Sequence, residues 1–345
     1  SSFSCPLPIL NHDSVQLAHG SGGKLSAELL EKLFLPRFGN ETLDRLEDQA
    51  VLTLPPGRLA FSTDTFVVDP VFFPGGNIGD LAINGTVNDI AMAGANPLYL
   101  SVGFVLEEGL PLEALHRILL SMEEAAWGAG VQIVTGDTKV VPRGSCDKIF
   151  INTSGIGVVP EGVNMSVASL QAGDKIILSG SVADHGMAIM TCRRGLSFQS
   201  VIESYTAALN SLVADMLLVS KDIRTMRDPT RGGLATTLNE FARSAATGIV
   251  VEQEKVSVNP DVQGACEILG IDPLIVANEG KLVAVVPAAV ADDIVQIMRQ
   301  HPLGRQAMVI GEVVVEHPGV VALQTALGVS QVLDMPVGEQ LPRIC

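Results

Sequence analysis

Cysteine, aromatic side chains and long apolar runs are all scarce in this chain of 345 residues. Its five cysteines stand far apart and form no Cys-X-X-Cys pair, which argues against a disulfide framework and a zinc cluster. No uninterrupted run of about 18 apolar residues occurs, so the sequence predicts no transmembrane helix. Residues 1–9 lack the basic segment and apolar run of a signal peptide, so we expect a protein of the reducing cytoplasm.

Positive charge is also scarce. The chain has 22 Lys and Arg residues against 38 Asp and Glu residues, a formal net charge of −16. This balance argues against nucleic acid or acidic membranes as partners bound through general electrostatics. An acidic protein can still bind nucleotides when its carboxylates hold Mg²⁺ that bridges to phosphates. Hydrophobic residues make up 47% of the chain, enough for sizeable cores, and the length suggests two domains.

Helical and strand patterns alternate in both halves, which indicates an α/β or α+β protein with two domains. Helices are expected at 77–93, 111–128, 204–221, 234–246 and 288–300. Strands are expected at 50–54, 59–62, 67–68, 98–106, 131–134, 149–159, 174–178, 282–286 and 308–315. The expected divisions are a Gly-rich segment with its helix (1–46), a first domain (47–160), a connection (160–173), a second domain (172–334) and an extended, flexible tail (335–345).

The sequence ends in Pro342-Arg343-Ile344-Cys345. A thiolate is a strong nucleophile near neutral pH, and the end of a chain is its most mobile part. Cys345 is therefore a candidate carrier, on whose sulfur a group is loaded, changed and passed on. The alternative is a frayed end whose last residue happens to be cysteine. A prenylation signal is excluded, because it needs the cysteine four residues from the end.

A Gly-rich turn, Gly20-Ser21-Gly22-Gly23-Lys24, precedes an expected helix. It is not a Walker A motif, because Leu25 stands where Ser or Thr is required. The N–H groups of such a segment can still wrap phosphates at the start of a helix. The alternative is a flexible turn.

Acidic and amide side chains form a second group of candidates. Asp48 precedes an expected strand, Asp64 follows one, and Asp89 lies on an expected helix with Asn84 and Asn88 one turn apart. A helix that otherwise faces a core should not carry these groups unless they meet something polar. Oxygen ligands from several elements suit Mg²⁺ bound together with phosphates. Helix capping and turn formation are the alternative for each residue alone.

Three further loops carry chemistry. Gly136-Asp137-Thr138-Lys139 follows a buried strand, where ligands gather in open α/β sheets. Asp228-Pro229-Thr230-Arg231-Gly232-Gly233 precedes a helix and supplies a carboxylate, a guanidinium and N–H groups. Glu279 stands just before a strand. An ordinary turn is the alternative for each of the last two.

In this order, the motifs resemble the ATP-binding superfamily of aminoimidazole ribonucleotide synthetase and selenophosphate synthetase over nearly the whole chain. Ala183-Asp184-His185-Gly186-Met187-Ala188-Ile189-Met190 and the final four residues narrow the resemblance to the HypE family of hydrogenase maturation proteins. Glu47-Asp48 occupies the place of the usual paired acids, and Gln49 follows where a small residue is common. Gly22 and Gly23 stand where selenophosphate synthetases carry a reactive Cys or Sec, so that chemistry is not expected.

The resemblance implies two PurM-like domains, with strands that pair across a homodimer into a central barrel. It implies an ATP-dependent carbamoyl dehydratase. The thiol of Cys345 would accept a carbamoyl group from the carbamoyltransferase HypF, and ATP would drive its dehydration to a thiocyanate. The cyano group would then pass to iron on a HypC–HypD scaffold, for the nickel–iron hydrogenase centre.

The resemblance also implies residue roles. Magnesium would be held by Asp48, Asp64, Asp89 and Asp228. The nucleotide would be bound by Gly22, Gly23, Lys24, Asp64, Asn84, Asp89, Gly136, Asp137, Thr138, Asp228, Thr230, Arg231 and Gly232. Cys345 is the expected carrier, with Glu279 and Lys139 as candidates for holding and deprotonating the carbamoyl group. His185 is expected to be structural or to dock the tail.

Two rival functions remain open. One is a non-catalytic carrier that a nucleotide switches. The other is a different enzyme of the superfamily that phosphorylates a small amide or carbonyl compound. The retained carboxylates and Gly-rich loops argue against a degenerate site.

Overall fold

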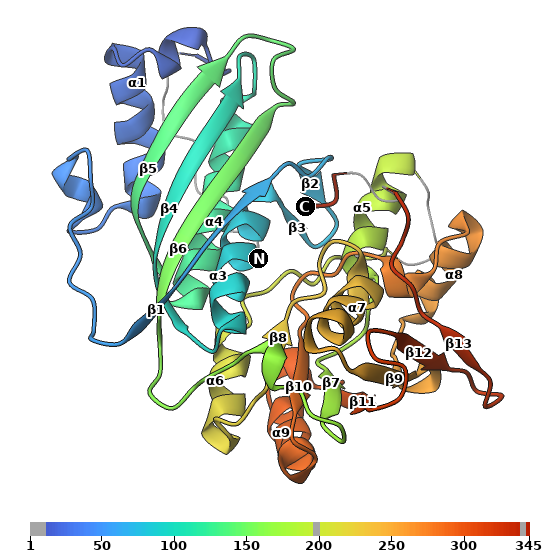
Figure 1. Cartoon of the computed structure of the whole chain (residues 1–345). Coiled ribbons are helices and arrows are strands. Elements are labelled where there is room, and N and C mark those ends of the chain that lie inside the picture. The colour runs from blue at the N-terminus through green and yellow to red at the C-terminus, as the bar shows by residue number, and fades with distance from the viewer. Residues whose placement is uncertain (1–11, 196–200, 339–342) are drawn as a thin grey trace.

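The computed structural model describes residues 12–195, 201–338 and 343–345. Over these residues the chain forms two mixed α/β domains, each built on its own sheet (Figure 1). The mixed α/β class predicted from the sequence is therefore confirmed. No helix of the described part is long and apolar enough to cross a membrane.

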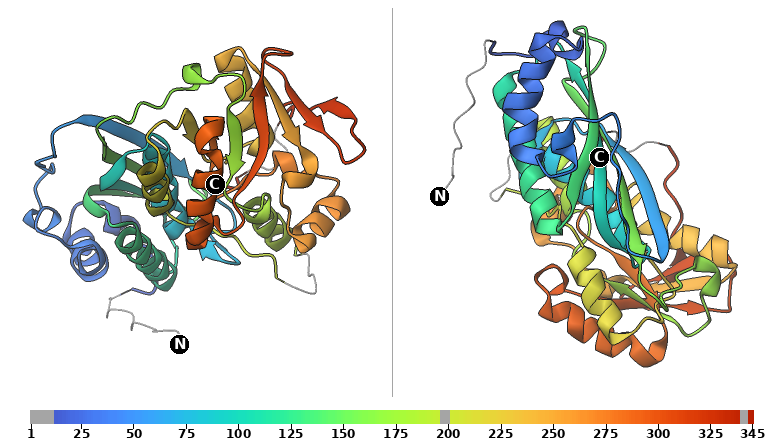
Figure 2. Two further views of the ribbon diagram at one scale, coloured as in Figure 1. Left: turned by 90° about the horizontal axis from the view of Figure 1, so that it is seen from below. Right: turned by 90° about the vertical axis from the view of Figure 1, so that its left-hand side faces the viewer.

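The first domain is built on a four-stranded sheet in the order β1-β6-β4-β5, in which only β4 and β5 are parallel. Its strands are β1 (Arg58–Phe66), β4 (Asn96–Glu107), β5 (Gln132–Val141) and β6 (Ile149–Val159). Buried and half-buried residues alternate along β6, so one face packs on a core and the other is more open. The right-hand view of Figure 2 shows helices along one side of this sheet.

Helices α3 (Ile78–Met92) and α4 (Leu112–Ala129) cover the buried face. Asn77 caps α3 by accepting the N–H of Gly79 at 2.8 Å, and Asp80 accepts the N–H of Asn77 at 2.8 Å. The glycine Gly130 ends α4 with a φ of 70°, a conformation that favours glycine. The N-terminal helix runs through α1 (Lys24–Leu29), a π-helical turn (Leu30–Phe34) and α2 (Leu35–Phe38). A small hairpin of β2 (Phe72–Phe73) and β3 (Gly76–Asn77) precedes α3.

The second domain is built on a seven-stranded sheet in the order β13-β12-β9-β11-β7-β10-β8, antiparallel except for β9 and β12. Its strands are β7 (Lys175–Leu178), β8 (Thr225–Arg227), β9 (Gly248–Glu252), β10 (Val283–Val286), β11 (Met308–Val314), β12 (Val321–Gln324) and β13 (Ser330–Val332). Its helices are α5 (Asp184–Arg194), α6 (Asn210–Val219), α7 (Gly233–Ala245), α8 (Pro260–Leu269) and α9 (Ala288–Gln300). Apolar side chains of α7 pack on one face of the sheet, and those of α6 and α9 pack on the other.

Most predicted elements are present, and four predictions are wrong. The strand expected at 67–68 does not form, because β1 already ends at Phe66. The expected strand 50–54 is irregular, and the strand expected at 131–134 continues to Val141. The expected helix 204–221 begins only at Asn210, because residues 201–209 run as an irregular segment between the two domains.

The last three residues of the sequence lie against the first domain. Ile344 is only 3% exposed and belongs to the core that contains α3 and α4. Figure 1 shows this end of the chain between the β2–β3 hairpin and α5. The tail therefore lies between elements of both domains.

Candidate active site

All three backbone carbonyls of residues 343–345 accept hydrogen bonds. Val67 donates its N–H to Cys345 O at 3.2 Å, and Asp69 donates its N–H to Arg343 O at 3.3 Å. The imidazole Nε2 of His185 lies 3.0 Å from Ile344 O, and Arg193 Nη2 donates to Arg343 O at 2.8 Å. We call the donors Val67, Asp69, His185 and Arg193 the tail clamp.

The side chain of Arg343 adds to this docking. Its Nε donates to Val67 O at 3.0 Å, and its guanidinium forms an ion pair with Asp147. The chain positions that the clamp joins are far apart in sequence, so the contacts depend on the tertiary fold. His185 is thus a tail-docking residue, one of the two roles expected for it.

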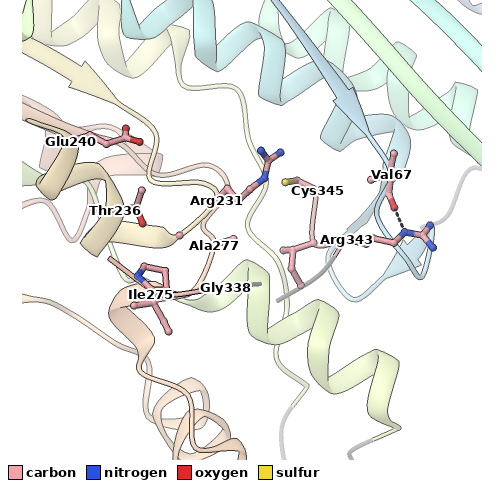
Figure 3. Close-up of a pocket in the computed structure, with 12 residues that line it drawn as sticks. Val67, Arg231, Thr236, Glu240, Ile275, Ala277, Gly338, Arg343 and Cys345 are labelled. Atoms are coloured by element: carbon pink, nitrogen blue, oxygen red, sulfur yellow. Dashed lines mark hydrogen bonds between the residues drawn. The ribbon is translucent and has the colours of Figure 1, made fainter. Parts of the chain in front are cut away.

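The thiol of Cys345 lies beside a cavity of about 740 Å³ between the two domains. Figure 3 shows its sulfur and the guanidinium of Arg231 pointing toward each other. The cavity is also lined by Gly232, Glu240 and Ala277. Burial, together with the charges of Glu279 and Asp64, raises the pKa of Cys345 to about 11, and Arg231 partly opposes this shift. The docked sulfur is therefore held as a neutral thiol.

Four acids from different elements interact beside this thiol: Asp64 of β1, Asp89 of α3, Asp228 after β8, and Glu279 before β10. Burial is the first cause of a raised pKa in each of them. Mutual repulsion adds to it, because Asp89 and Asp64 raise the pKa of Asp228, which reaches about 7. We call these residues the acid cluster.

Glu279 is the most constrained member of the acid cluster. It is only 4% exposed, and its Oε2 has no hydrogen-bond partner among the described residues. Burial and then the charge of Asp228 raise its pKa well above the ordinary value. A carboxyl group with this high pKa and an unpaired oxygen is ready to bind or accept a proton from a ligand.

The buried amide of Asn278 fixes the loops around the acid cluster. Its Nδ2 donates to Pro229 O at 3.0 Å, and its Oδ1 accepts the N–H of Ala183 at 2.7 Å. It thereby ties the segment before β10 to the Asp228–Gly233 loop and to the start of α5. Gly233 has a φ of 63°, and a Cβ there would lie 2.6 Å from Val276 O, so this close approach requires glycine.

A second cavity, of about 470 Å³, borders two members of the acid cluster. It is lined by Ser62, Asp89, Arg227 and Asp228 among others. Ser62 Oγ donates to Asp89 at 2.8 Å, and Arg227 forms an ion pair with Glu240, which lines the cavity of Cys345. Asp89 and Asp228 therefore face this second cavity, and the Arg227–Glu240 pair connects it to the cavity of Cys345.

The candidates on β5 lie apart from the acid cluster within one chain. Gly136, Asp137, Thr138 and Lys139 belong to the strand itself and not to a loop after it. Strands β1 and β5 are the opposite edges of the sheet, about 14 Å apart at the usual strand spacing. Lys139 pairs with Asp137 at 2.5 Å, and both side chains are about two-thirds exposed (65% and 67%).

A third cavity, of about 340 Å³, collects the β5 candidates. Its lining includes Gly136, Asp137, Thr138, Lys139 and Gly22, together with Phe34, Phe104 and other apolar side chains. Gly23 and Lys24 are exposed at the start of α1, next to this cavity in sequence. The Gly-rich turn and β5 thus meet at one site.

Two other candidates, Asn84 and Asp48, lie outside the acid cluster. Asn84 donates to Thr206 Oγ1 at 3.3 Å, and its neighbour Asn88 binds the backbone of Ala207 and Leu209. These amides therefore anchor residues 201–209. Asp48 is exposed on the irregular segment before β1.

The acid cluster suits magnesium only when a bound nucleotide supplies some of the ligands. In the described part of the chain, no three acidic, His or Cys side chains are grouped closely enough to hold a metal. Repelling carboxylates with raised pKa values suit a divalent cation, and Mg²⁺ commonly uses one or two carboxylates plus phosphate oxygens. The residues present therefore fit Mg²⁺ that is bound together with a nucleotide.

Known proteins resemble the chain over almost its whole length. The family models of AIR synthase related protein match residues 46–159 with the N-terminal domain and residues 171–324 with the C-terminal domain. Carbamoyl dehydratase HypE of Azotobacter vinelandii is 52% identical over 336 residues, which cover 97% of this chain and 98% of the relative. The chain belongs to the HypE family. The resemblance predicted from the motifs is confirmed.

Solved HypE structures agree with this assignment. A HypE structure in complex with ATP matches with a TM-score of 0.93 and 49% identity, covering 96% of this chain and 99% of that one. A chain from a HypE–HypF complex matches with a TM-score of 0.79 and 47% identity, covering 89% and 99%. The HypE fold thus carries the site described above.

Sequence reasoning missed most of the tail clamp. No sequence motif marks Val67, Asp69 or Arg193. Val67 and Asp69 bind the tail through their backbone N–H groups, and the Arg193 side chain binds a backbone carbonyl of the tail. Ser204, which bonds His185 at 2.8 Å, lies in a segment that was predicted to be helical. The available signal was the pair of amides, Asn84 and Asn88, on a buried helix face, which indicated a polar neighbour but not which one.

Proposed function

We propose that this chain is an ATP-dependent carbamoyl dehydratase that converts an S-carbamoyl group on Cys345 into an S-cyano group. One observation carries the proposal: the thiol of Cys345 is held beside the acid cluster, where Glu279 and Asp64 act on its pKa. The membership of the HypE family supports the same assignment.

The proposed reaction starts with the carbonyl oxygen of the carbamoyl group. This oxygen attacks the γ-phosphorus of ATP while the amide nitrogen loses one proton, so an O–P bond forms and ADP leaves. The C–O bond then breaks, phosphate departs and takes up the equivalent of the second N–H proton, and the carbon–nitrogen bond becomes triple. Phosphorylation is needed because an amide oxygen alone is a poor leaving group.

Residues of this chain have distinct roles in the proposal. Glu279 holds the amide nitrogen and accepts its proton, for which its raised pKa makes it a stronger base. Arg231, which faces the sulfur, is placed to bind transferring phosphate oxygens. Asp64, Asp89 and Asp228 would hold Mg²⁺, which neutralises phosphate charge when bound. Thr230 and Gly232, in the same loop as Arg231, would bind the nucleotide.

Loading and processing require different positions of the tail. A neutral, buried thiol is a weak nucleophile, so the docked position suits processing and not loading. We propose that Cys345 leaves the clamp to receive the carbamoyl group and returns with it. HypF is the proposed donor, supported by the HypE–HypF complex among the similar structures. The proposed acceptor of the cyano group is a HypC–HypD iron scaffold.

We propose a homodimer in which the sheets of two first domains close into a barrel. Among the residues that the structure describes, no further strand pairs with β1 or β5 at the two edges of the four-stranded sheet. Large apolar side chains are exposed on β1 and just before it: Leu46 (57%), Val51 (68%), Leu59 (52%) and Phe61 (70%). Closure removes free sheet edges and buries these side chains.

The dimer would also explain the position of Lys139. If β5 of one subunit pairs beside β1 of the other, then Lys139 and the nucleotide candidates of β5 lie next to the partner's acid cluster. A nucleotide could then place its adenosine near the β5 cavity and its phosphates near the acids. Mixing a Lys139→Ala subunit with an Asp64→Asn subunit tests this: partial recovery of activity supports a shared site, and none contradicts it.

The experiment for the function compares wild type with Cys345→Ala. Protein loaded with a carbamoyl group should release ADP in step with formation of the thiocyanate. The Cys345→Ala variant should bind ATP normally and release no ADP in that assay. Full activity of the variant on a diffusible amide would indicate a different enzyme of the superfamily. A loaded thiol that ATP leaves unchanged would indicate a passive carrier.

A further inference from the structure

Residues 201–209 form a crossing segment that contacts both domains. Ser204 donates its N–H to Pro74 O at 2.9 Å, and Asn88 of α3 binds the backbone of Ala207 and Leu209 at 3.0 and 2.8 Å. On the other side, a Cβ on Gly280 would lie 2.1 Å from Tyr205 O. The crossing segment is therefore fixed between α3 and the segment that carries Glu279.

Ser204 connects the crossing segment to the tail clamp. Its Oγ lies 2.8 Å from His185 Nδ1, and His185 Nε2 lies 3.0 Å from Ile344 O. Ser204 and His185 are 3% and 1% exposed. A buried chain of hydrogen bonds thus runs from the crossing segment to the residue before Cys345.

The chemistry of the two bonds fixes where the protons lie. A carbonyl oxygen only accepts, so Nε2 must carry the proton in the bond to Ile344. A neutral imidazole then has an unprotonated Nδ1, which must accept the hydroxyl proton of Ser204. Burial lowers the pKa of His185 to about 4, which keeps the ring neutral near physiological pH.

We propose that Ser204 is a positioning residue that holds His185 with its Nε2–H toward Ile344 and thereby holds the sulfur of Cys345 at the acid cluster. A hydroxyl that donates to Nδ1 stabilises this tautomer and this ring orientation. Without this hydroxyl, Nδ1 of His185 is a buried acceptor with no hydrogen bond, which favours rotation of the ring away from Ile344. The consequence for catalysis rests on the proposed function, whereas the docking itself does not.

Amide exchange measures the docking without any chemistry on the thiol. The N–H groups of Val67 and Asp69 are bonded to Cys345 O and Arg343 O, so they report whether the tail is in place. Ser204→Ala should speed their exchange by about fivefold or more. The N–H of Val213 bonds to Leu209 O in the first turn of α6, and its exchange rate should not change.

Matched variants separate positioning from general stability. Ser204→Thr keeps the hydroxyl and should restore slow exchange. Ser179→Ala removes another fully buried serine hydroxyl, one that accepts the N–H of Leu282, and should leave the tail reporters unchanged. In His185→Gln, an amide can donate to Ile344 without help, so adding Ser204→Ala should have little further effect.

Nitrogen NMR of wild-type protein tests the proton placement directly. Protonated Nε2 and unprotonated Nδ1 in His185 are expected, and a shift of this pattern is expected in Ser204→Ala. A proton on Nδ1 in wild type would overturn the proposal even if Ser204→Ala fails to fold. Unchanged exchange at Val67 and Asp69 in a folded Ser204→Ala protein would overturn it too. A different outcome would reject the proposed function and keep the positioning role. In it, exchange at Val67 and Asp69 is faster in Ser204→Ala, but ATP leaves the carbamoyl group on Cys345 of the wild type unchanged.

Discussion

The backbone N–H of Val67 lies 3.2 Å from the carbonyl oxygen of Cys345. Val67 directly follows strand β1, which carries Asp64 of the acid cluster. One stretch of chain therefore presents an acid to the site and holds the residue that carries the thiol. This arrangement places Cys345 by backbone contacts, which do not depend on what is attached to the sulfur.

Alkylation of Cys345 should be slow and should report on docking. A pKa of about 11, against an ordinary 9.0, lowers the thiolate fraction at pH 8 about a hundredfold. Docking favours the neutral thiol. The stabilisation of the docked tail by this thiol is therefore complete below pH 9 and is lost as the pH rises toward 11. Peptide-resolved iodoacetamide labelling, without nucleotide and magnesium, measures this rate.

Breaking the tail clamp should speed this labelling. Arg193→Met removes the donor to Arg343 O and should raise the rate at Cys345 about fivefold or more. Arg194→Met, a change at the exposed neighbour, is the matched control and should leave the rate unchanged. Equal rates in wild type and Arg193→Met would contradict the docked position.

Replacing Glu279 by glutamine should separate binding from chemistry. Glu279→Gln keeps the shape and removes the base, so turnover of carbamoyl-loaded protein should fall about a hundredfold or more. Binding of ATP and the melting temperature should change little, because glutamine keeps the size and polarity of the buried side chain. Glu312→Gln, which affects a surface pair with Lys175, is the control. Normal turnover of Glu279→Gln would remove this residue from the mechanism.

Asp228 should make the stability of the metal-free protein depend on pH. Its pKa is raised to about 7 from 3.8, so the folded protein retains a proton that the unfolded chain loses. Its contribution to the free energy of unfolding is full below pH 4 and is lost as the pH rises through about 7. Asp228→Asn should flatten this dependence and raise stability at pH 8 by about 1–4 kcal/mol.

Denaturant unfolding in EDTA at pH 5 and pH 8 measures this effect. Magnesium with ATP should stabilise wild type more at pH 8 than at pH 5, since the deprotonated acids bind the cation. The same gain in Asp228→Asn as in wild type would argue against a metal at this residue.

Phe34 should anchor the N-terminal helix on the sheet. Its ring is 6% exposed and contacts Phe104 edge-on at 5.1 Å between centroids. Phe34→Ala should lower the free energy of unfolding by about 3–5 kcal/mol, as measured in urea. Leu327→Ala, at a side chain that is 90% exposed, should cost less than about 0.5 kcal/mol. A similar small cost for Phe34→Ala would mean that the helix is not fixed there.

The sequence predicted elements whose ends carry local signals. Strand β6 was expected at 149–159 and is Ile149–Val159, and α9 was expected at 288–300 and is Ala288–Gln300. Residues 204–209 were predicted to be helical because their composition permits it. The fold overrides this preference, since Asn88 and Pro74 bind the backbone of the crossing segment instead.

The candidate site could be predicted only where a side chain itself bears the chemistry. Asp64, Asp89, Asp228 and Glu279 were recognised as acids in turns and helices, and the fold brings them together. Most of the tail clamp could not be found in this way, because donors such as the Val67 N–H bind backbone carbonyls of a tail that is far away in sequence. Lys139 shows the opposite limit, since its motif is clear but its place in one chain is the far edge of the sheet.

Intact-protein mass spectrometry of the loaded chain tests the central claim most directly. Protein carrying a carbamoyl group on Cys345 is mixed with ATP and magnesium, and its mass is followed with the modified peptide located. The account predicts the loss of one water, about 18 Da, confined to the peptide that ends in Cys345 and absent without ATP. A carbamoylated peptide that keeps its mass in the presence of ATP would contradict it.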